Sequence, residues 1–143
     1  MGWLNWYGLI AVVVILVPNA VCALMKKDAF ENGNIRRAVL VSEEIGRYGC
    51  MAFSVFNLPY TYWGFWFSRA LPVYLSVGGA CLLFYLLGWI LFFRRGGGME
   101  VWLSVTPTVF FLFCGVMLLS APLIVSAILF GIAHIFISIR NAK

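Results

Sequence analysis

The ionisable side chains that could perform chemistry are few and come from two parts of the sequence. Glu43, Glu44 and Arg47 lie close together, and His134 is the only histidine in the chain. On an α-helix, Glu43 and Arg47 would share one face, because residues four apart are neighbours on the helix surface. Together with an imidazole, such a pair could relay protons or bind an anion. The alternative is structural: the Glu–Arg pair fixes a helix end and the histidine hydrogen-bonds a neighbouring helix.

A longer stripe of polar residues begins at Glu43 and Arg47. It continues with four further residues, Cys50, Ser54, Asn57 and Thr61. These steps of three or four residues keep the stripe on one face of a helix, since about 3.6 residues complete a turn. The stripe could line a polar pathway or form the seam along which helices pack. We expect packing at Cys50 and Ser54. Asn57 is a candidate site residue, because the sequence Asn-Leu-Pro at 57–59 should break or kink the helix.

The overall composition predicts an integral membrane protein. Hydrophobic residues make up 64% of the 143 positions and charged residues only 10%, whereas a soluble domain carries about 25% charged residues. The mean hydropathy is +0.99. The net charge of +5 comes from basic residues that lie between apolar stretches. Because there is no basic helix face and no aromatic-basic interleaving, we expect no nucleic-acid partner.

Five apolar segments have the length of a membrane span, which needs about 20 residues. We expect spans at residues 3–25, 44–67, 70–93, 99–119 and 122–139, joined by loops that include residues 26–33 and 96–98. Residues 99–139 are too long for one span, so a turn is expected at Ser120-Ala121-Pro122. The aromatic-rich residues 60–67 are either an interfacial belt or a continuation of the second helix. The fold class is therefore an all-α polytopic transmembrane bundle in one domain.

The basic residues predict the orientation of this bundle. One side would hold nine of the ten Lys and Arg residues, namely Lys26, Lys27, Arg36, Arg37, Arg47, Arg94, Arg95, Arg140 and Lys143. The other side would hold Arg69 alone. Since cytoplasmic loops carry the excess of Lys and Arg, we expect the N-terminus outside and the C-terminus inside.

Prolines and small residues give two further expectations. Pro18-Asn19 in the first span and Thr106-Pro107-Thr108 in the fourth should interrupt their helices, and interrupted helices are frequent at transporter binding sites. Small residues recur at 127, 131, 134 and 138 and again at 78–80, which predicts close-packing faces within one chain or between copies.

Neither a metal site nor a cofactor site is predicted. The four cysteines fall one in each of the first four spans, without a C-x-x-C motif, and a single histidine adds little. No residue is assigned a catalytic role. The candidate polar site consists of Glu43, Glu44, Arg47, Asn57 and His134.

Three functions are compatible with this sequence. The first choice is a transporter-like or channel-like protein, based on the polar stripe and the expected helix breaks. The second is an enzyme at the inner leaflet that uses the Glu, Arg and His side chains. The third is a non-catalytic accessory subunit. The expected surroundings are the lipid bilayer of a cytoplasmic or plasma membrane, which the chain crosses several times, with a second copy or a membrane subunit as partner.

Overall fold

The computed structural model describes residues 3–25, 35–62, 64–95 and 98–141. Within these ranges the chain forms five helices: α1 (Trp6–Met25), α2 (Arg37–Val55), α3 (Ala70–Arg95), α4 (Glu100–Leu118) and α5 (Ala121–Asn141). Four of them, α1, α3, α4 and α5, are long and apolar enough to cross a membrane. The all-α helix bundle is therefore confirmed, and the four apolar helices are compatible with a multi-pass membrane protein. The number of five spans and the orientation stay predictions.

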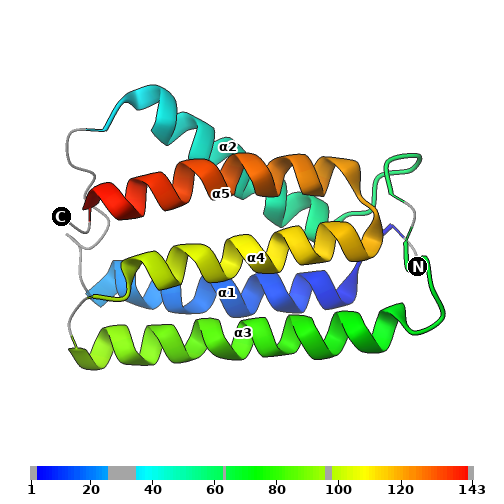
Figure 1. The fold of residues 1–143 in the computed structure, drawn as a ribbon, viewed down its shortest axis with the longest axis horizontal. Coiled ribbons are helices and arrows are strands. Elements are labelled where there is room, and N and C mark those ends of the chain that lie inside the picture. Colours follow the sequence, from blue (N-terminus) through cyan, green and yellow to red (C-terminus); the bar gives the residue numbers. More distant parts are fainter. Residues whose placement is uncertain (1–2, 26–34, 63, 96–97, 142–143) are drawn as a thin grey trace.

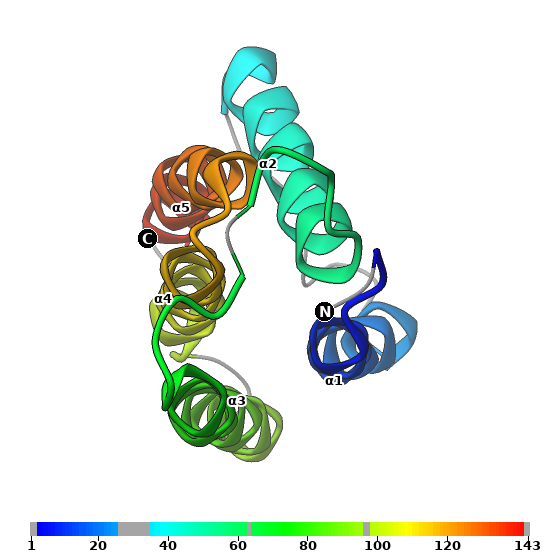
Figure 2. The same cartoon turned by 90° about the vertical axis from the view of Figure 1, so that its right-hand side faces the viewer.

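Four helices form an arc, and α1 packs against the two helices at its ends. α2 packs on α5, α5 on α4, and α4 on α3, while α1 contacts α2 and α3. An end view shows α2, α5, α4 and α3 following one another, with α1 on the open side of the arc (Figure 2). α2 is inclined to the other helices and crosses α5 (Figure 1). This crossing is where the candidate polar residues meet.

Successive helices run in opposite directions, so the bundle has two distinct ends (Figure 1). One end, which we name the basic end, holds five arginines among the described residues: Arg36, Arg37, Arg94, Arg95 and Arg140. The opposite end holds Arg69. The distribution agrees with the charge asymmetry expected from the sequence. Lys26, Lys27 and Lys143, the predicted loop at 26–33 and residues 96–97 lie outside the described residues.

α2 differs most from the sequence-based expectation. It ends at Val55, so it does not continue helically to residue 67. In a longer helix the Val55 carbonyl would accept a hydrogen bond from the N–H of residue 59, which is a proline and has none. That carbonyl instead accepts the N–H of Asn5 at 2.7 Å. Asn57 N–H in turn donates to the Trp3 carbonyl at 2.8 Å, forming a short antiparallel bridge with the N-terminal segment.

Residues 56–62 and 64–69 form a non-helical segment that lies over the turn between α4 and α5. Gly64 N–H donates to the Leu118 carbonyl at 2.9 Å, and the Trp66 indole donates to the Val116 carbonyl at 3.2 Å. A helix leaves its last carbonyls without the usual backbone donors. The Leu118 carbonyl is paired here by Gly64, and the Val116 carbonyl is shared between Trp66 and the Leu119 N–H, which lies 3.2 Å away. The turn follows at Leu119, which has a left-handed backbone (φ 46°). The predicted turn near residue 120 is therefore confirmed, and the aromatic segment is not a helix.

The expected interruptions at Pro18 and Pro107 are wrong, because α1 and α4 each continue through their proline. Side chains next to the prolines hydrogen-bond the helix backbone there. Asn19 Nδ2 donates to the Ile15 carbonyl at 2.7 Å, and Thr108 Oγ1 donates to the Ser104 carbonyl at 2.8 Å. Neither bond reaches the carbonyl that the proline leaves without its backbone donor, which belongs to Val14 for Pro18 and to Leu103 for Pro107.

Small residues bring α5 close to its neighbours, as predicted. Ala127 and Gly131 are both buried, and a methyl group added at Gly131 would collide with Thr108 of α4. The small residues of α3 differ from one another. Gly78 is buried, and a methyl group there would lie 3.4 Å from the Phe110 ring of α4. A methyl group at Gly79 would meet no atom within 4 Å, so this part of α3 borders open space instead of a tightly packed helix.

Candidate functional site

Glu43 is the centre of a polar cluster between α2 and α5. Its Oε1 accepts a hydrogen bond from Arg47 Nη1 at 3.4 Å and lies 3.2 Å from His134 Nδ1. The Glu43 side chain is 8% exposed, whereas those of Arg47 and His134 are 35% and 29% exposed. We name these three residues the Glu43 cluster. Its carboxylate is buried, and both of its partners reach the surface.

The two contacts of Glu43 have different origins. Arg47 lies one helical turn further along α2, so its contact follows from local geometry. At 3.4 Å it is long for a hydrogen bond, and the contact with His134 is shorter. The Arg47 guanidinium also lies 5.2 Å from the centre of the Tyr48 ring. The imidazole on α5 is therefore the closer partner of the carboxylate, and it joins two helices.

Close approach of the helix backbones brings His134 to Glu43. Gly46 faces α5 one turn after Glu43, and a methyl group at this position would lie 2.5 Å from the Phe130 backbone nitrogen. Only a residue without a side chain allows this contact. The His134 ring stacks on the Phe130 ring, with centroids 4.6 Å apart and planes 19° from parallel. The stacked Phe130 ring therefore holds the imidazole in position, and the absence of a side chain at Gly46 lets α2 approach α5.

The structure separates the other two candidate residues from this cluster. Glu44 is exposed, because it lies about 100° around the helix from Glu43. Asn57 lies beyond the other end of α2, about 20 Å away by the helical rise. It is 6% exposed while Phe56 is 47% exposed, so Asn57 faces the interior of the bundle. It belongs to the junction with the N-terminal segment.

The stripe between these two ends is closely packed. Cys50 and Ser54 are 0% and 2% exposed. α1 approaches α2 here, since a methyl group at Gly8 would collide with the Ser54 carbonyl. Ser54 Oγ has no hydrogen-bond partner among the described residues. These observations agree with the interpretation of Cys50 and Ser54 as packing residues.

Two polar residues, one just before α1 and one within it, make contacts that were not predicted from the sequence. Asn5 is fully buried, and its Oδ1 accepts the N–H of Gly8 at 3.2 Å as a helix cap. An asparagine directly before an apolar run is a capping signal, which could have identified it. Asn19 donates to the Tyr85 hydroxyl of α3 at 2.6 Å. That contact joins residues far apart in the sequence, and no local pattern indicates it.

The donor set of the cluster favours acid–base chemistry over metal binding. Within the described ranges, no group of three or more His, Cys, Asp or Glu side chains could hold a metal ion. The four cysteines are free thiols. A carboxylate beside an imidazole can accept and donate protons, and the nearby guanidinium stabilises the charged carboxylate. Comparisons with protein families, with curated proteins and with solved structures gave no match.

Proposed function

We propose that this multi-pass membrane protein is transporter-like and that the Glu43 cluster takes up and releases protons at the cytoplasmic side. The observation that carries the proposal is the 3.2 Å contact between Glu43 Oε1 and His134 Nδ1. Ionisable residues inside membrane bundles commonly serve as proton relays or line ion pathways. Here a partly exposed imidazole meets a buried carboxylate, which gives a proton a short route from the surface into the helix interface.

The proposal includes α2 as a fifth span. α2 has 19 residues, which corresponds to about 28 Å, close to the thickness of the hydrocarbon core. Its direction alternates with that of its neighbours (Figure 1). Four charged residues lower its hydropathy: Arg37, Glu43, Glu44 and Arg47. Three of them lie in the half of α2 nearer the basic end, and Arg47 lies one residue past its midpoint. The rest of α2, from Tyr48 to Val55, carries no charged residue.

Protonation of Glu43 would change the contact between α2 and α5. One carboxylate oxygen faces both Arg47 and His134. A neutral carboxyl group attracts these donors less strongly than a carboxylate does. Uptake of a proton therefore weakens the bridge between the two helices. A ligand or proton that binds one arrangement of α2 better than another shifts the population toward it, which is the basis for coupling in a transporter.

An enzyme at the inner leaflet is the second candidate, and the packing beyond the cluster favours it. Cys50 and Ser54, which follow the cluster along α2, are buried. Within the cluster, the partly exposed side chains are those of Arg47 and His134. A carboxylate–imidazole pair that is reached from one side is also suited to general acid–base catalysis. In that case the pair would serve a substrate at the membrane surface.

Proton flux in proteoliposomes tests the transport proposal. The purified protein is reconstituted with an entrapped pH-sensitive dye, and a membrane potential is applied. We expect faster acidification than in empty liposomes, and a loss of at least tenfold in Glu43→Gln. Glu44→Gln is the matched control, because Glu44 is exposed on the adjoining face, and its flux should equal that of the wild type.

The possible results separate the two candidates. Wild-type flux equal to that of empty liposomes contradicts transport of protons and leaves the one-sided enzyme as the function of the pair. Strong flux that Glu43→Gln does not change contradicts the role of the cluster.

A further inference from the structure

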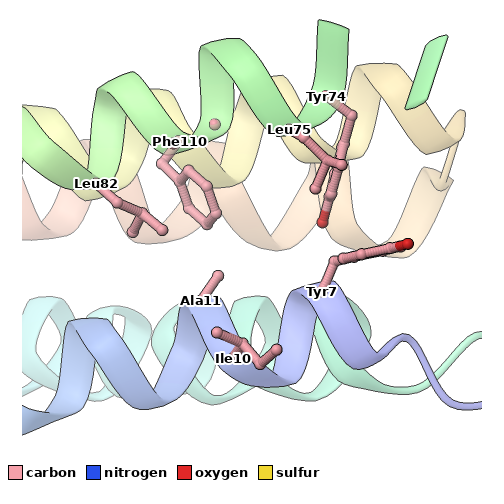
Figure 3. Close-up of a pocket in the computed structure, with 9 residues that line it drawn as sticks. Tyr7, Ile10, Ala11, Tyr74, Leu75, Leu82 and Phe110 are labelled. Carbon is pink, nitrogen blue, oxygen red and sulfur yellow. The ribbon is translucent and has the colours of Figure 1, made fainter. Parts of the chain in front are cut away.

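A groove between α1 and α3 lies apart from the Glu43 cluster. It has a volume of about 150 Å³ and is bordered by three helices. Its lining includes Tyr7 and Ile10 of α1, Tyr74, Gly79 and Leu82 of α3, and Phe110 of α4. The side chains of Ala11 and Leu82 point into the space between the helices, and the ring of Phe110 lies beside Leu82 (Figure 3). The lining is almost entirely apolar.

The groove exists because a hydrogen bond connects α1 and α3 near the basic end, whereas glycines of α3 leave a gap between the two helices further along. Asn19 and Tyr85 connect them by a 2.6 Å hydrogen bond in the half nearer the basic end. Toward the opposite end, Gly78 and Gly79 present no side chain to α1. A methyl group at Gly79 would meet nothing within 4 Å. The space at this level is therefore open to a molecule from outside the chain.

The dimensions of the groove fit one hydrocarbon chain. Its lining on α3 extends from Tyr74 to Leu82, about 12 Å along the helix axis. Apolar cavities of about this volume admit a molecule the size of a six-carbon ring, whereas another helix is about 10 Å wide. Ile10 and Leu75 at the rim are 61% and 45% exposed. The groove thus opens on the outer surface of the bundle, where the acyl chains of the bilayer lie.

The end of the groove furthest from the basic end is polar. The hydroxyl of Tyr74 points toward α1 (Figure 3) and faces the side chains of Asn5 and Cys114. Asn5 is fully buried, and its Nδ2 has no hydrogen-bond partner within the described part of the chain. Buried amide groups are nearly always paired. Asn5 is not among the lining residues, whereas Tyr74 is, so the Tyr74 hydroxyl is the polar group at this end that a ligand in the groove could reach.

We propose that the groove binds one acyl chain of a membrane phospholipid. The chain lies along Gly78 and Gly79, and its ester carbonyl oxygen accepts a hydrogen bond from the Tyr74 hydroxyl, which the Asn5 side chain faces from within the bundle. Tyr74 lies toward the end of the bundle where α3 begins, just after Arg69, the level at which lipid headgroups meet the outer surface in the proposed orientation. The site is separate from the Glu43 cluster and does not depend on its function.

Photolabelling with a phosphatidylcholine that carries a diazirine in its acyl chain tests this site. The full-length protein in nanodiscs is illuminated, and the labelled residues are mapped by mass spectrometry. We expect adducts at the groove residues of α1 and α3, reduced at least fivefold in Gly79→Leu, whose side chain fills the groove. Ala80→Leu is the matched control, because it adds the same side chain one position further, outside the lining, and it should label as the wild type does.

A second comparison tests the polar end. In the wild type, an ester-linked lipid should compete for labelling about three to ten times better than its ether-linked analogue, as expected for one hydrogen bond. Tyr74→Phe should reduce this preference. Equal labelling of Gly79→Leu and wild type, or adducts spread evenly over lipid-facing positions such as Leu83, would overturn the proposal. Crosslinks between two copies of the chain at the groove, in place of lipid adducts, would overturn it as well.

Discussion

Substitution of Gly46 by alanine offers a sharp test of how the cluster is assembled. The added methyl group would lie 2.5 Å from the backbone nitrogen of Phe130 and 2.7 Å from its Cα. Comfortable contacts between such atoms are about 3.5–4.0 Å. The α5 backbone must therefore move away by about 1 Å. Overpacking of this kind typically destabilises a protein by about 1–3 kcal/mol.

The same displacement affects the two contacts of Glu43 unequally. The contact with His134 is 3.2 Å and crosses between helices, so a shift of about 1 Å takes it beyond hydrogen-bonding distance. The contact with Arg47 lies within α2 and moves with the helix. Gly46→Ala should therefore detach the imidazole while leaving the Glu–Arg pair in place.

Nitrogen NMR can follow this change at a single site, because His134 is the only histidine in the chain. In protein labelled with ¹⁵N-histidine, the Nδ1 resonance should shift in Gly46→Ala, and the free energy of unfolding should fall by about 1–3 kcal/mol. Gly79→Ala is the matched control, since its methyl group meets nothing within 4 Å, and it should keep both values near those of the wild type. An unchanged Nδ1 resonance in Gly46→Ala would refute the close crossing of α2 and α5.

Three further predictions concern topology and the interior. In a cysteine-free background, a cysteine at Ser68 should be labelled from outside and one at Asn141 from inside, and the reverse pattern contradicts the N-out orientation. Tyr85→Phe should lower the free energy of unfolding by about 1–3 kcal/mol, because it removes the oxygen that an α1 amide donates to, whereas Tyr48→Phe at an exposed position should change it little. Ser54→Ala should be neutral or stabilising, since its hydroxyl has no partner among the described residues; a loss above about 1 kcal/mol would show that one exists.

The four apolar helices could be predicted from the sequence because their boundaries depend on local properties. Apolar stretches of membrane length end at charged residues or at turn residues in each case. The predicted span 70–93 corresponds to α3 at Ala70–Arg95, and the span 122–139 corresponds to α5 at Ala121–Asn141. Hydrophobic length and terminal charge are enough for such elements.

The candidate site could be predicted in part. The Glu43–Arg47 contact follows from helical spacing, and it was expected. The contact between His134 and Glu43 could not be predicted, because it depends on how α5 is rotated about its axis. That rotation depends on the packing of Phe130 against Gly46, and no pattern around the histidine indicates it. The groove was not foreseen for the same reason. Gly78 and Gly79 resemble a packing face in sequence, and only the structure shows that Gly78 packs near Phe110 of α4 while Gly79 borders open space.

The hydrogen bonds that hold the end of α2 could not be predicted from the sequence of α2 alone. Asn-Leu-Pro at 57–59 indicates a break, and the structure confirms it. The acceptor and donor left by that break are paired with Asn5 and Trp3, which are about 50 positions earlier in the chain. Pairing at such sequence distance depends on the tertiary arrangement, and no periodicity in the intervening residues encodes it.

The two ends of α2 are consequently held by different kinds of interaction. At the end opposite the basic end, backbone hydrogen bonds of 2.7 and 2.8 Å join it to the N-terminal segment, and these bonds do not depend on the protonation of any side chain. At the other end, the connection to α5 passes through the carboxylate of Glu43. If protonation of Glu43 moves α2, the end of α2 held by the backbone bridge stays in place, and the end that carries Arg37 moves. The proposed function therefore places the conformational change at the basic end, on the side from which the proton arrives.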